Sequence, residues 1–190
     1  MMATYPIEIV QLLVSPAHAY FGRARDGAAD VETLLPESAD CVAGKGVRGD
    51  RFFNVRAHTE AAVTFLAAEA WQAAWQHVHG GENAVAPFEL ARRNVVVRGV
   101  ELDKLRGEDF TISCGESTVR FHGGRPAHPC SWMDTMVAPG MRKALIGRGG
   151  LRAGVVVSGT LRLGPALLRC DAQLDAARAA EPVMRAQPLP

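Results

Sequence analysis

The stretch RRNVVVRGVELDKLRGEDFTI (residues 92–112) decides the fold class. Its β-branched run Val95–Val97 and the segment Phe110–Ile112 each predict a short strand, and a turn-forming Arg98-Gly99 and a short LDKL segment separate them. The two strands therefore follow one another without a helix of ordinary length between them, which argues against a doubly wound sheet.

The flanking sequence continues this pattern. Residues 5–14 alternate apolar and polar side chains and then become continuously apolar, which suits a strand that enters a core. Residues 61–66 predict a short strand, and the alternation in 117–123 predicts a half-buried antiparallel one. The segment AGVVVSGTLRLGPALLRC (153–170) predicts a strand, a Ser-Gly turn and another strand.

Helices are fewer in this sequence. Trp71, Trp75 and Val78 lie at i, i+4 and i+7, which predicts an amphipathic helix that begins near Ala67 and ends at Gly80-Gly81. Because no polar groups accompany the two tryptophans, we expect their face to pack on the barrel rather than on a cofactor.

The predicted fold is mainly β, of the α+β kind: a β-barrel of mostly antiparallel strands with a few inserted helices. A second short helix is predicted in GMRKALIG (140–147). We expect one domain over residues 1–170 and a tail over 171–190 that starts as a frayed helix and ends in a flexible segment.

Length and charge exclude several classes of protein. With 190 residues and 48% hydrophobic side chains, the chain is long enough to bury one sizeable core. Its 21 Lys and Arg oppose 20 Asp and Glu, so no global charge marks it for nucleic acid or a membrane surface. Neither a bilayer-spanning apolar run nor a secretory signal is present, and we expect a cytoplasmic protein.

Of the four cysteines, Cys130 stands apart. Cys41, Cys114 and Cys170 are expected to act as small apolar side chains, and no CxxC pair is present for zinc or thiol exchange. Cys130 lies in RPAHPCSWMD (125–134), directly after a proline and without a helical or strand period. That is a poor place for a core cysteine, so we expect its thiol to be accessible.

Two basic segments offer partners for an anion. The guanidiniums and amide of RRN (92–94) suit bidentate contact with phosphate or carboxylate, although paired arginines usually belong to a solvated face. The glycine-rich stretch 43–51 favours a loop that exposes backbone N–H groups. Its Asp50 and Arg51 either join an anion pocket or simply pair across a turn. Together with Cys130, these groups predict an anion pocket that contains a thiolate.

Other motifs are weaker. GRGGLRAG (147–154) lacks the Gly-Lys-Ser/Thr ending of a nucleotide-binding loop and runs into a strand, so we expect a structural turn. The six histidines form no zinc pattern. His18, and His128 two residues before Cys130, are the ones that we retain as candidates for the pocket.

The order of these segments resembles the MOSC family, the domain found at the C-terminus of molybdenum cofactor sulfurases. The resemblance covers nearly the whole chain and implies a MOSC-type β-barrel. It is carried by SPAHAYFGR (15–23), GKGVRGDRFF (44–53), AVTFLAAEAW (62–71), RRNVVVRGVELDKLRGEDF (92–110), HPCSWMD (128–134) and GRGGLRAGVVVSGTLRLG (147–164).

The resemblance implies the molybdenum cofactor, molybdopterin, as the ligand. It also implies that Cys130 either carries a persulfide sulfur or ligates molybdenum, and that an Arg-x-Asn motif before a strand helps to hold the cofactor. Combined with the anion pocket, it predicts a cofactor-binding set of Arg92, Asn94, Arg51, Asp50 and His18. Arg93, inside the motif, is expected to point elsewhere.

Three functions remain open at this stage. In the first, Cys130 cycles between thiolate and persulfide as a sulfur carrier. In the second, Cys130 is a permanent molybdenum ligand in a reductase of N-hydroxylated compounds. In the third, the protein is a non-catalytic module that binds or stores the cofactor.

The partners differ between these hypotheses. The chain is too short to contain a pyridoxal-phosphate desulfurase domain, so we expect no pyridoxal phosphate to bind here and sulfur to come from a cysteine desulfurase-type donor. It has no flavin, haem or iron–sulfur motif, so a reductase needs an electron-transfer partner. A second copy in a homodimer is one way to cover the cofactor.

Overall fold

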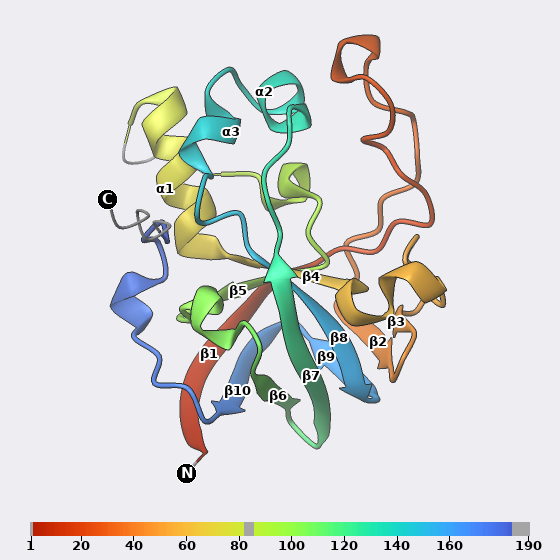
Figure 1. Ribbon diagram of the computed structural model, residues 1–190, viewed down its shortest axis with the longest axis vertical. Coiled ribbons are helices and arrows are strands. Elements are labelled where there is room, and N and C mark those ends of the chain that lie inside the picture. The colour runs from red at the N-terminus through yellow and green to blue at the C-terminus, as the bar shows by residue number, and fades with distance from the viewer. Residues whose placement is uncertain (1, 82–85, 184–190) are drawn as a thin grey trace, which may run out of the picture.

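Seven strands close into a barrel in the order β1-β10-β6-β7-β8-β4-β5 (Figure 1). We describe residues 2–81 and 86–183 of a computed structural model. The neighbouring barrel strands run antiparallel except for β4 and β5, which are parallel. The barrel strands are β1 (Ala3–Leu12), β4 (Val63–Ala67), β5 (Val95–Arg98), β6 (Asp109–Cys114), β7 (Ser117–Pro126), β8 (Leu151–Val157) and β10 (Gly164–Cys170).

A smaller sheet and several helices complete the fold. The sheet has the strand order β3-β2-β9 and consists of β2 (Ser38–Val42), β3 (Gly46–Val47) and β9 (Gly159–Arg162). The α-helices, α1 (Ala68–His79), α2 (Trp132–Met136) and α3 (Met141–Ala144), gather beyond one end of the barrel (Figure 1). Short 3-10 helices are η1 (Ala24–Asp26), η2 (Arg56–Ala61), η3 (Phe88–Ala91), η4 (Leu102–Leu105) and η5 (Ala176–Arg178).

The predicted fold class, a mainly β barrel with a few inserted helices, is therefore confirmed. Its interior is filled by side chains from facing strands, as in other small barrels. Phe65, Phe110 and Phe121 meet there with ring centroids 5.1 to 5.7 Å apart. A ligand site must consequently lie outside the barrel wall or at its ends.

A second apolar cluster forms outside the barrel, where the helices cover β4 and β5. Trp71 is completely buried there against Leu66 and Val96 of the barrel and Met133 of α2. Trp75 is only partly buried and stacks on His79 with ring centroids 3.8 Å apart. The prediction that this helix face is structural is confirmed, and α2, which follows Cys130, is held to the barrel through it.

Two sequence predictions need correction. Residues 153–170 form parts of three strands rather than two, because β9 leaves the barrel to pair with β2 in the small sheet before the chain returns as β10. The C-terminal segment begins with no α-helix: among the described residues it contains only η5, and Ala179 is buried in the main core. The flexible end that we expected lies in 184–190, outside the described residues.

The C-terminal segment is fastened to the barrel by polar contacts. Tyr5 donates a hydrogen bond to the Ala172 carbonyl over 3.0 Å, and Arg178 lies 3.5 Å from the Glu101 carboxylate. The Val183 N–H donates to the Gly147 carbonyl over 2.9 Å. Across the described residues, no helix has the length and apolar character that a bilayer crossing needs.

Candidate functional site

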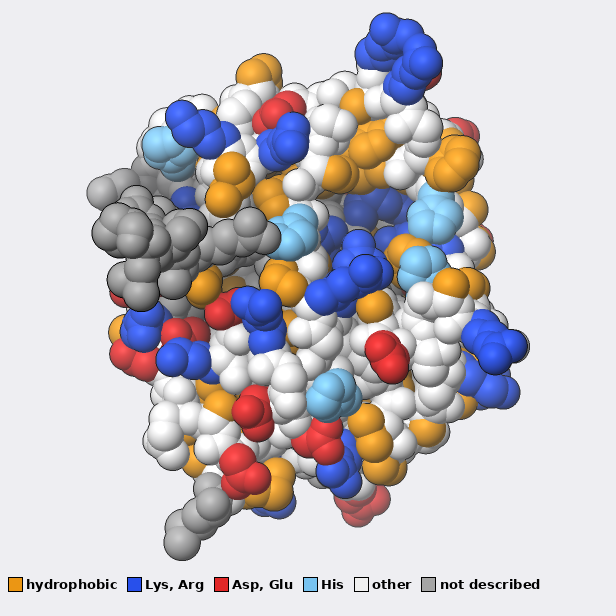
Figure 2. Space-filling model, in the orientation of Figure 1, with side chains coloured by type: hydrophobic (Ala, Val, Ile, Leu, Met, Phe, Trp, Pro, Cys, Tyr) orange, Lys and Arg blue, Asp and Glu red, His pale blue; other side chains and the backbone are white. Residues whose placement is uncertain are grey.

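A pocket of about 230 Å³ lies against the outer face of the barrel, and Cys130 opens into it. Figure 2 shows a hollow in which basic side chains gather, with histidines near its rim. The residues that line the pocket come from the loop after β1, the turn after β3, the segment before β5, the Cys130 loop, and strands β4 and β8. They are His18, Ala19, Tyr20, Arg51, Phe52, Thr64, Ala91, Arg92, Arg93, Cys130, Met133 and Arg152.

Thr64 of β4 and Arg152 of β8 form the floor of the pocket, and Asn94 lies beside Thr64 at the start of β5. Phe65 pairs with Val95 in the parallel β4–β5 ladder, so Thr64 lies beside Asn94. Thr64 also pairs with Arg152 in the β4–β8 ladder. Directly paired residues on adjacent strands project from the same face of a sheet. Because the adjacent residues fill the barrel, Thr64 and Arg152 face outward.

Asn94 and Asp50 form a hydrogen-bond network behind the pocket wall. The Asn94 side chain donates from Nδ2 to an Asp50 oxygen over 2.9 Å, and its Oδ1 accepts from the backbone and hydroxyl of Thr64 over 3.0 and 2.9 Å. The second Asp50 oxygen accepts from the Phe52 N–H over 3.1 Å. Asn94 is 2% exposed and Asp50 is 5% exposed, and neither is among the residues that line the pocket.

Asp50 therefore acts on the pocket through Arg51. Their ion pair measures 3.2 Å, which is the pairing across a turn that the sequence left open. The Arg51 guanidinium also lies over the Phe52 ring, 4.8 Å from its centroid. These two contacts hold one cation at the pocket wall, paired with the buried carboxylate.

Arg92 occupies an unusual backbone position. Its φ of 51° lies in the left-handed region, which few non-glycine residues adopt and which often marks a functional segment. Its guanidinium donates to the hydroxyls of Ser15 and Thr33 over 2.8 and 2.9 Å and lies 5.5 Å from the centre of the Tyr20 ring. Arg92 thus ties both ends of the long loop between β1 and β2 to the pocket.

Arg93 also lines the pocket, contrary to our expectation that it points elsewhere. It donates hydrogen bonds to the carbonyls of Gly149, Ala127 and Ala91 over 3.2 to 3.3 Å. Burial, together with the neighbouring charge of Arg152, lowers the pKa of Arg93 to about 10, although Cys130 acts in the opposite direction. This side chain joins the 147–150 turn to the start of the Cys130 loop.

The glycines of that turn are structural, as the sequence predicted. A Cβ on Gly149 would lie 2.4 Å from the Ala127 carbonyl oxygen and 3.0 Å from the Pro129 ring, so only glycine allows this close approach. The Gly149 carbonyl of the turn accepts hydrogen bonds from Arg93. The turn thereby packs against the segment that leads into Cys130.

Cys130 is exposed, whereas Cys41, Cys114 and Cys170 are buried. Burial raises the pKa of Cys41 to about 12 and raises the pKa of Cys170 as well. On the other side of the Cys130 loop, the Trp132 ring stacks on Tyr20 with centroids 5.3 Å apart and an interplanar angle of 6°. The one accessible thiol of the chain is therefore held in a supported loop.

The two candidate histidines, His18 and His128, line different pockets. His18 lines the pocket with its ring edge-on to Phe52, 5.1 Å between centroids. Burial, and then the charge of Arg51, lowers the pKa of His18, so a neutral imidazole faces the pocket at neutral pH. His128 is not among the residues that line this pocket and instead lines a different one.

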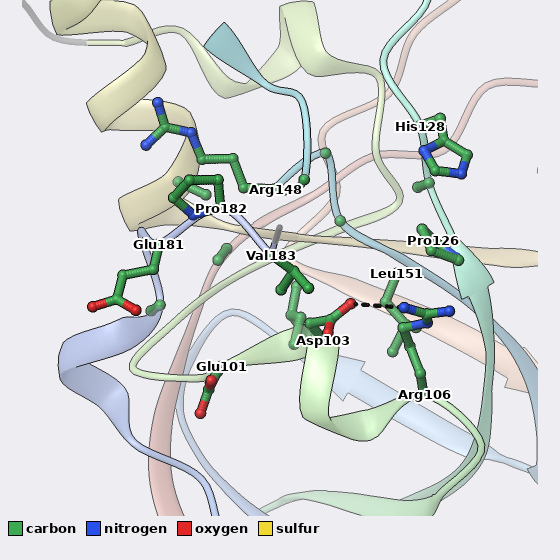
Figure 3. A pocket seen from close by; sticks show the side chains of 18 of the residues that line it. Glu101, Asp103, Arg106, Pro126, His128, Arg148, Leu151, Glu181, Pro182 and Val183 are labelled. Carbon is green, nitrogen blue, oxygen red and sulfur yellow. Dashed lines mark hydrogen bonds and ion pairs between the residues drawn. The ribbon is translucent and has the colours of Figure 1, made fainter. Parts of the chain in front are cut away.

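That second pocket is larger, about 430 Å³, and lies between η4 and the C-terminal segment. Figure 3 shows His128 on one side of it and Arg148 on the other. Its charges are mostly satisfied within the protein: Asp103 pairs with Arg106 at 3.4 Å, and Glu101 pairs with Arg178. It contains no cysteine, so we place the candidate site in the smaller pocket.

One further expectation is corrected at the glycine-rich stretch 43–51. Its backbone N–H groups do not face a ligand, because Gly44 donates to the Val155 carbonyl over 2.9 Å and Arg48 to the Asp40 carbonyl over 2.8 Å. The glycines instead shape a hairpin that includes β3. Only the side chains at its end contribute to the site.

Sequence reasoning missed Arg152, Thr64, Tyr20 and Met133. Arg152 follows the GRGG turn, and the alternation of Leu151, Arg152 and Ala153 would have indicated an outward side chain. No sequence signal reports the strand register that sets it beside Thr64. Among the described residues, no cluster of three or more His, Cys, Asp or Glu side chains is arranged to hold a metal ion.

Comparisons with solved structures identify proteins of the same fold. YuaD from Bacillus subtilis superposes with a TM-score of 0.63 at 15% identity, over 91% of this chain and 100% of that one. YiiM from Geobacillus stearothermophilus gives a TM-score of 0.57 at 15% identity, over 86% and 74% of the two chains. YiiM from Escherichia coli gives 0.53 at 16% identity, over 94% and 76%. No family model and no curated protein matches the sequence.

Selective modification should reveal the accessible thiol. At neutral pH and in the absence of denaturant, we expect iodoacetamide to label Cys130 at least tenfold faster than Cys41, Cys114 or Cys170, since these are buried. Peptide mass spectrometry over a time course measures the four rates. Equal labelling of Cys130 and the slowest cysteine would show that the thiol is not presented as described.

Replacing Asn94 should lower the stability of the protein and not only its affinity for a ligand. We expect Asn94→Ala to lower the free energy of unfolding by about 1–3 kcal/mol, because it leaves Asp50 and Thr64 with unpaired buried groups. Arg98→Ala, at the exposed end of β5, is the control and should cost less than about 1 kcal/mol. Urea denaturation compares the two, and equal stabilities would contradict the framework role of Asn94.

Proposed function

We propose that this protein is a MOSC-type protein that binds the molybdenum cofactor and uses Cys130 as a persulfide-bearing sulfur carrier. The observation that carries the proposal is the position of Cys130: it is the exposed cysteine of the chain and opens into a pocket lined by four arginines. The order of the sequence blocks and the structural likeness to YuaD and YiiM support the choice of fold family.

The types of group in the pocket fit the proposed cofactor. Molybdenum is held by soft sulfur ligands, and Cys130 supplies one more. The phosphate of the cofactor needs charge-assisted donors, and Arg51 and Arg92 supply guanidiniums at the pocket wall. When bound, the cofactor supplies a molybdenum centre that accepts sulfur.

The chain's own residues provide the carrier chemistry. The Cys130 thiolate attacks the terminal sulfur of a persulfide on a donor protein; a new S–S bond forms at Cys130 as the donor's S–S bond breaks, and the donor cysteine leaves as a thiolate. One sulfur atom moves and no external oxidant is needed. The guanidiniums that line the pocket place positive charge around any sulfur anion carried there.

The pocket is too small to enclose the whole cofactor, which leaves room for a partner protein. At about 230 Å³ it is smaller than the roughly 300–1,000 Å³ typical of sites that enclose a drug-sized ligand. A pterin with a phosphate tail would therefore remain partly uncovered. A donor of the cysteine desulfurase type, or a second copy of this chain, can reach the uncovered part.

A second candidate function has one specific observation in its favour. The Cys130 loop is braced from two sides, by the Arg93 hydrogen bonds and by the stack of Trp132 on Tyr20. A fixed thiolate suits a permanent metal ligand, as in a molybdenum-dependent reductase of N-hydroxylated compounds that receives electrons from a partner protein.

One experiment separates these functions. Wild type, Cys130→Ala and Cys114→Ala are purified from a host that makes the cofactor, and molybdenum content is measured. The apo-proteins are then exposed to a protein persulfide, and peptide mass spectrometry locates any added sulfur atom. We expect added sulfur on Cys130 in wild type and in Cys114→Ala, the matched buried cysteine.

The other outcomes are equally distinct. Molybdenum that is retained by wild type and lost in Cys130→Ala, with no sulfur added, would favour the reductase. Molybdenum retained equally by both would favour a storage module. Neither molybdenum nor added sulfur in wild type would contradict the proposed function.

A further inference from the structure

The larger pocket, between η4 and the C-terminal segment, has an apolar inner end. Its volume of about 430 Å³ lies within the roughly 300–1,000 Å³ range of sites that enclose a small molecule. Five of the residues that line it also belong to the main core, and three of these are alanines, whose small side chains leave space. They are Ala67, Ala70, Leu102, Leu151 and Ala179. An apolar group that enters the pocket is therefore removed from water.

The charged side chains around this pocket balance one another. Three carboxylates and three guanidiniums line it: Glu101, Asp103, Glu181, Arg106, Arg148 and Arg178. These six groups carry no net charge, whereas four guanidiniums line the Cys130 pocket. A ligand with one positive and one negative group keeps this balance, and a phosphate ester would not.

Four of the six groups already hold the C-terminal segment or the turn beside it. Arg148 donates to two backbone carbonyls over 2.8 and 2.9 Å. Arg178 lies 3.5 Å from the Glu101 carboxylate and 2.9 Å from the Glu181 carboxylate. A ligand that used these groups would have to displace contacts that fasten the chain. The remaining carboxylate and guanidinium are therefore the pair that is available to a ligand.

That pair, Asp103 and Arg106, is held together by one weak contact. Arg106 Nη1 lies 3.4 Å from Asp103 Oδ1, and the two side chains are 47% and 34% exposed. Exposed ion pairs of this kind contribute little to stability, so a ligand can replace the contact at small cost. Within residues 2–81 and 86–183, the second Asp103 oxygen and the other guanidinium N–H groups of Arg106 have no hydrogen-bond partner. Figure 3 shows the two side chains pointing toward each other at the pocket.

The pair is complementary to a zwitterion. Asp103 can accept from an ammonium group, and Arg106 can donate two parallel hydrogen bonds to a carboxylate. An α-amino acid carries both groups on one carbon atom, so they are as close together as the charged groups of this pair. Its side chain can then extend toward the apolar inner end. A carboxylate without an ammonium group would be repelled by Asp103, and an amine without a carboxylate would be repelled by Arg106.

We propose that this larger pocket binds a free α-amino acid with an apolar side chain, and that Asp103 and Arg106 recognise its ammonium and carboxylate groups. The core residues at the inner end favour an apolar side chain over none. The inference does not rest on the proposed function, because this pocket contains no cysteine and its ligand is not the cofactor.

Isothermal titration calorimetry of the full chain tests the class of ligand. The probes are L-leucine, L-methionine and L-phenylalanine, and we expect at least one to bind with a dissociation constant below about 1 mM. The tightest of them is compared with its analogues that lack the carboxylate or the ammonium group; for leucine these are 3-methylbutylamine and 4-methylpentanoate. Both analogues should bind at least about tenfold more weakly, and so should glycine, which lacks the apolar side chain.

Variants locate the bound amino acid. Asp103→Asn keeps the shape of the side chain and removes its charge, and Arg106→Gln removes the guanidinium. Each should weaken binding at least about tenfold. Asp109→Asn is the matched control, because Asp109 is an exposed carboxylate that pairs with Arg120 and does not line the pocket. The control should bind the amino acid as wild type does.

The results that would overturn the site are distinct. A dissociation constant above about 1 mM for all three amino acids would do so. Unchanged affinity in either natively folded variant would do so as well, and equal affinity for an amino acid and its analogue without the ammonium group would overturn the zwitterion. Circular dichroism checks folding, and if one variant is not native the other decides. No measurement uses molybdenum or a persulfide, so failure to carry sulfur would leave this site standing.

Discussion

The site depends on one buried carboxylate, Asp50. Its oxygens are shared among the backbone N–H groups of Ser15 and Phe52, the Arg51 guanidinium and the Asn94 amide. A carboxylate with so little exposure is stable only when these donors are all in place, because an unpaired buried charge costs several kcal/mol. The end of β1, the turn after β3 and the start of β5 must therefore meet at this point, and their meeting forms the back wall of the pocket.

This network explains why the chemistry lies outside the barrel. Phe65 and its aromatic neighbours fill the interior, so polar residues at the strand ends can project only outward. Thr64 and Arg152 then form a floor, and the loop of Cys130 forms a side that is braced by Arg93. The Cys130 loop is held by interactions that do not involve the Cys130 sulfur atom, which is exposed at the pocket.

Much of the fold was predictable because it rests on local patterns. β-Branched runs indicated β5 and β8, and the spacing of Trp71 and Trp75 indicated α1. The pattern could not show that β9 leaves the barrel, since its partner β2 is more than a hundred residues away along the chain. The C-terminal segment was also missed, because Ala179 is buried through tertiary contacts rather than through a periodic pattern.

Several residues of the site were predicted correctly, but the roles assigned to some of them were wrong. Cys130, Arg51, Arg92 and His18 lie in one pocket, as the charge argument indicated. Asn94 and Asp50 support that pocket from behind. Arg152 was overlooked and Arg93 was expected to point elsewhere, because strand register and close backbone packing decide which polar side chain faces the pocket. The sequence supplies the residue types, whereas the barrel geometry decides which of them meet a ligand.

The most direct test of the account is a crystal structure of the protein purified from a host that makes the molybdenum cofactor, with anomalous scattering recorded at the molybdenum edge. We expect a molybdenum peak beside the Cys130 sulfur and phosphate density at the arginines that line the same pocket. A peak in the larger pocket between η4 and the C-terminal segment, or cofactor density without contact to Cys130, would contradict it.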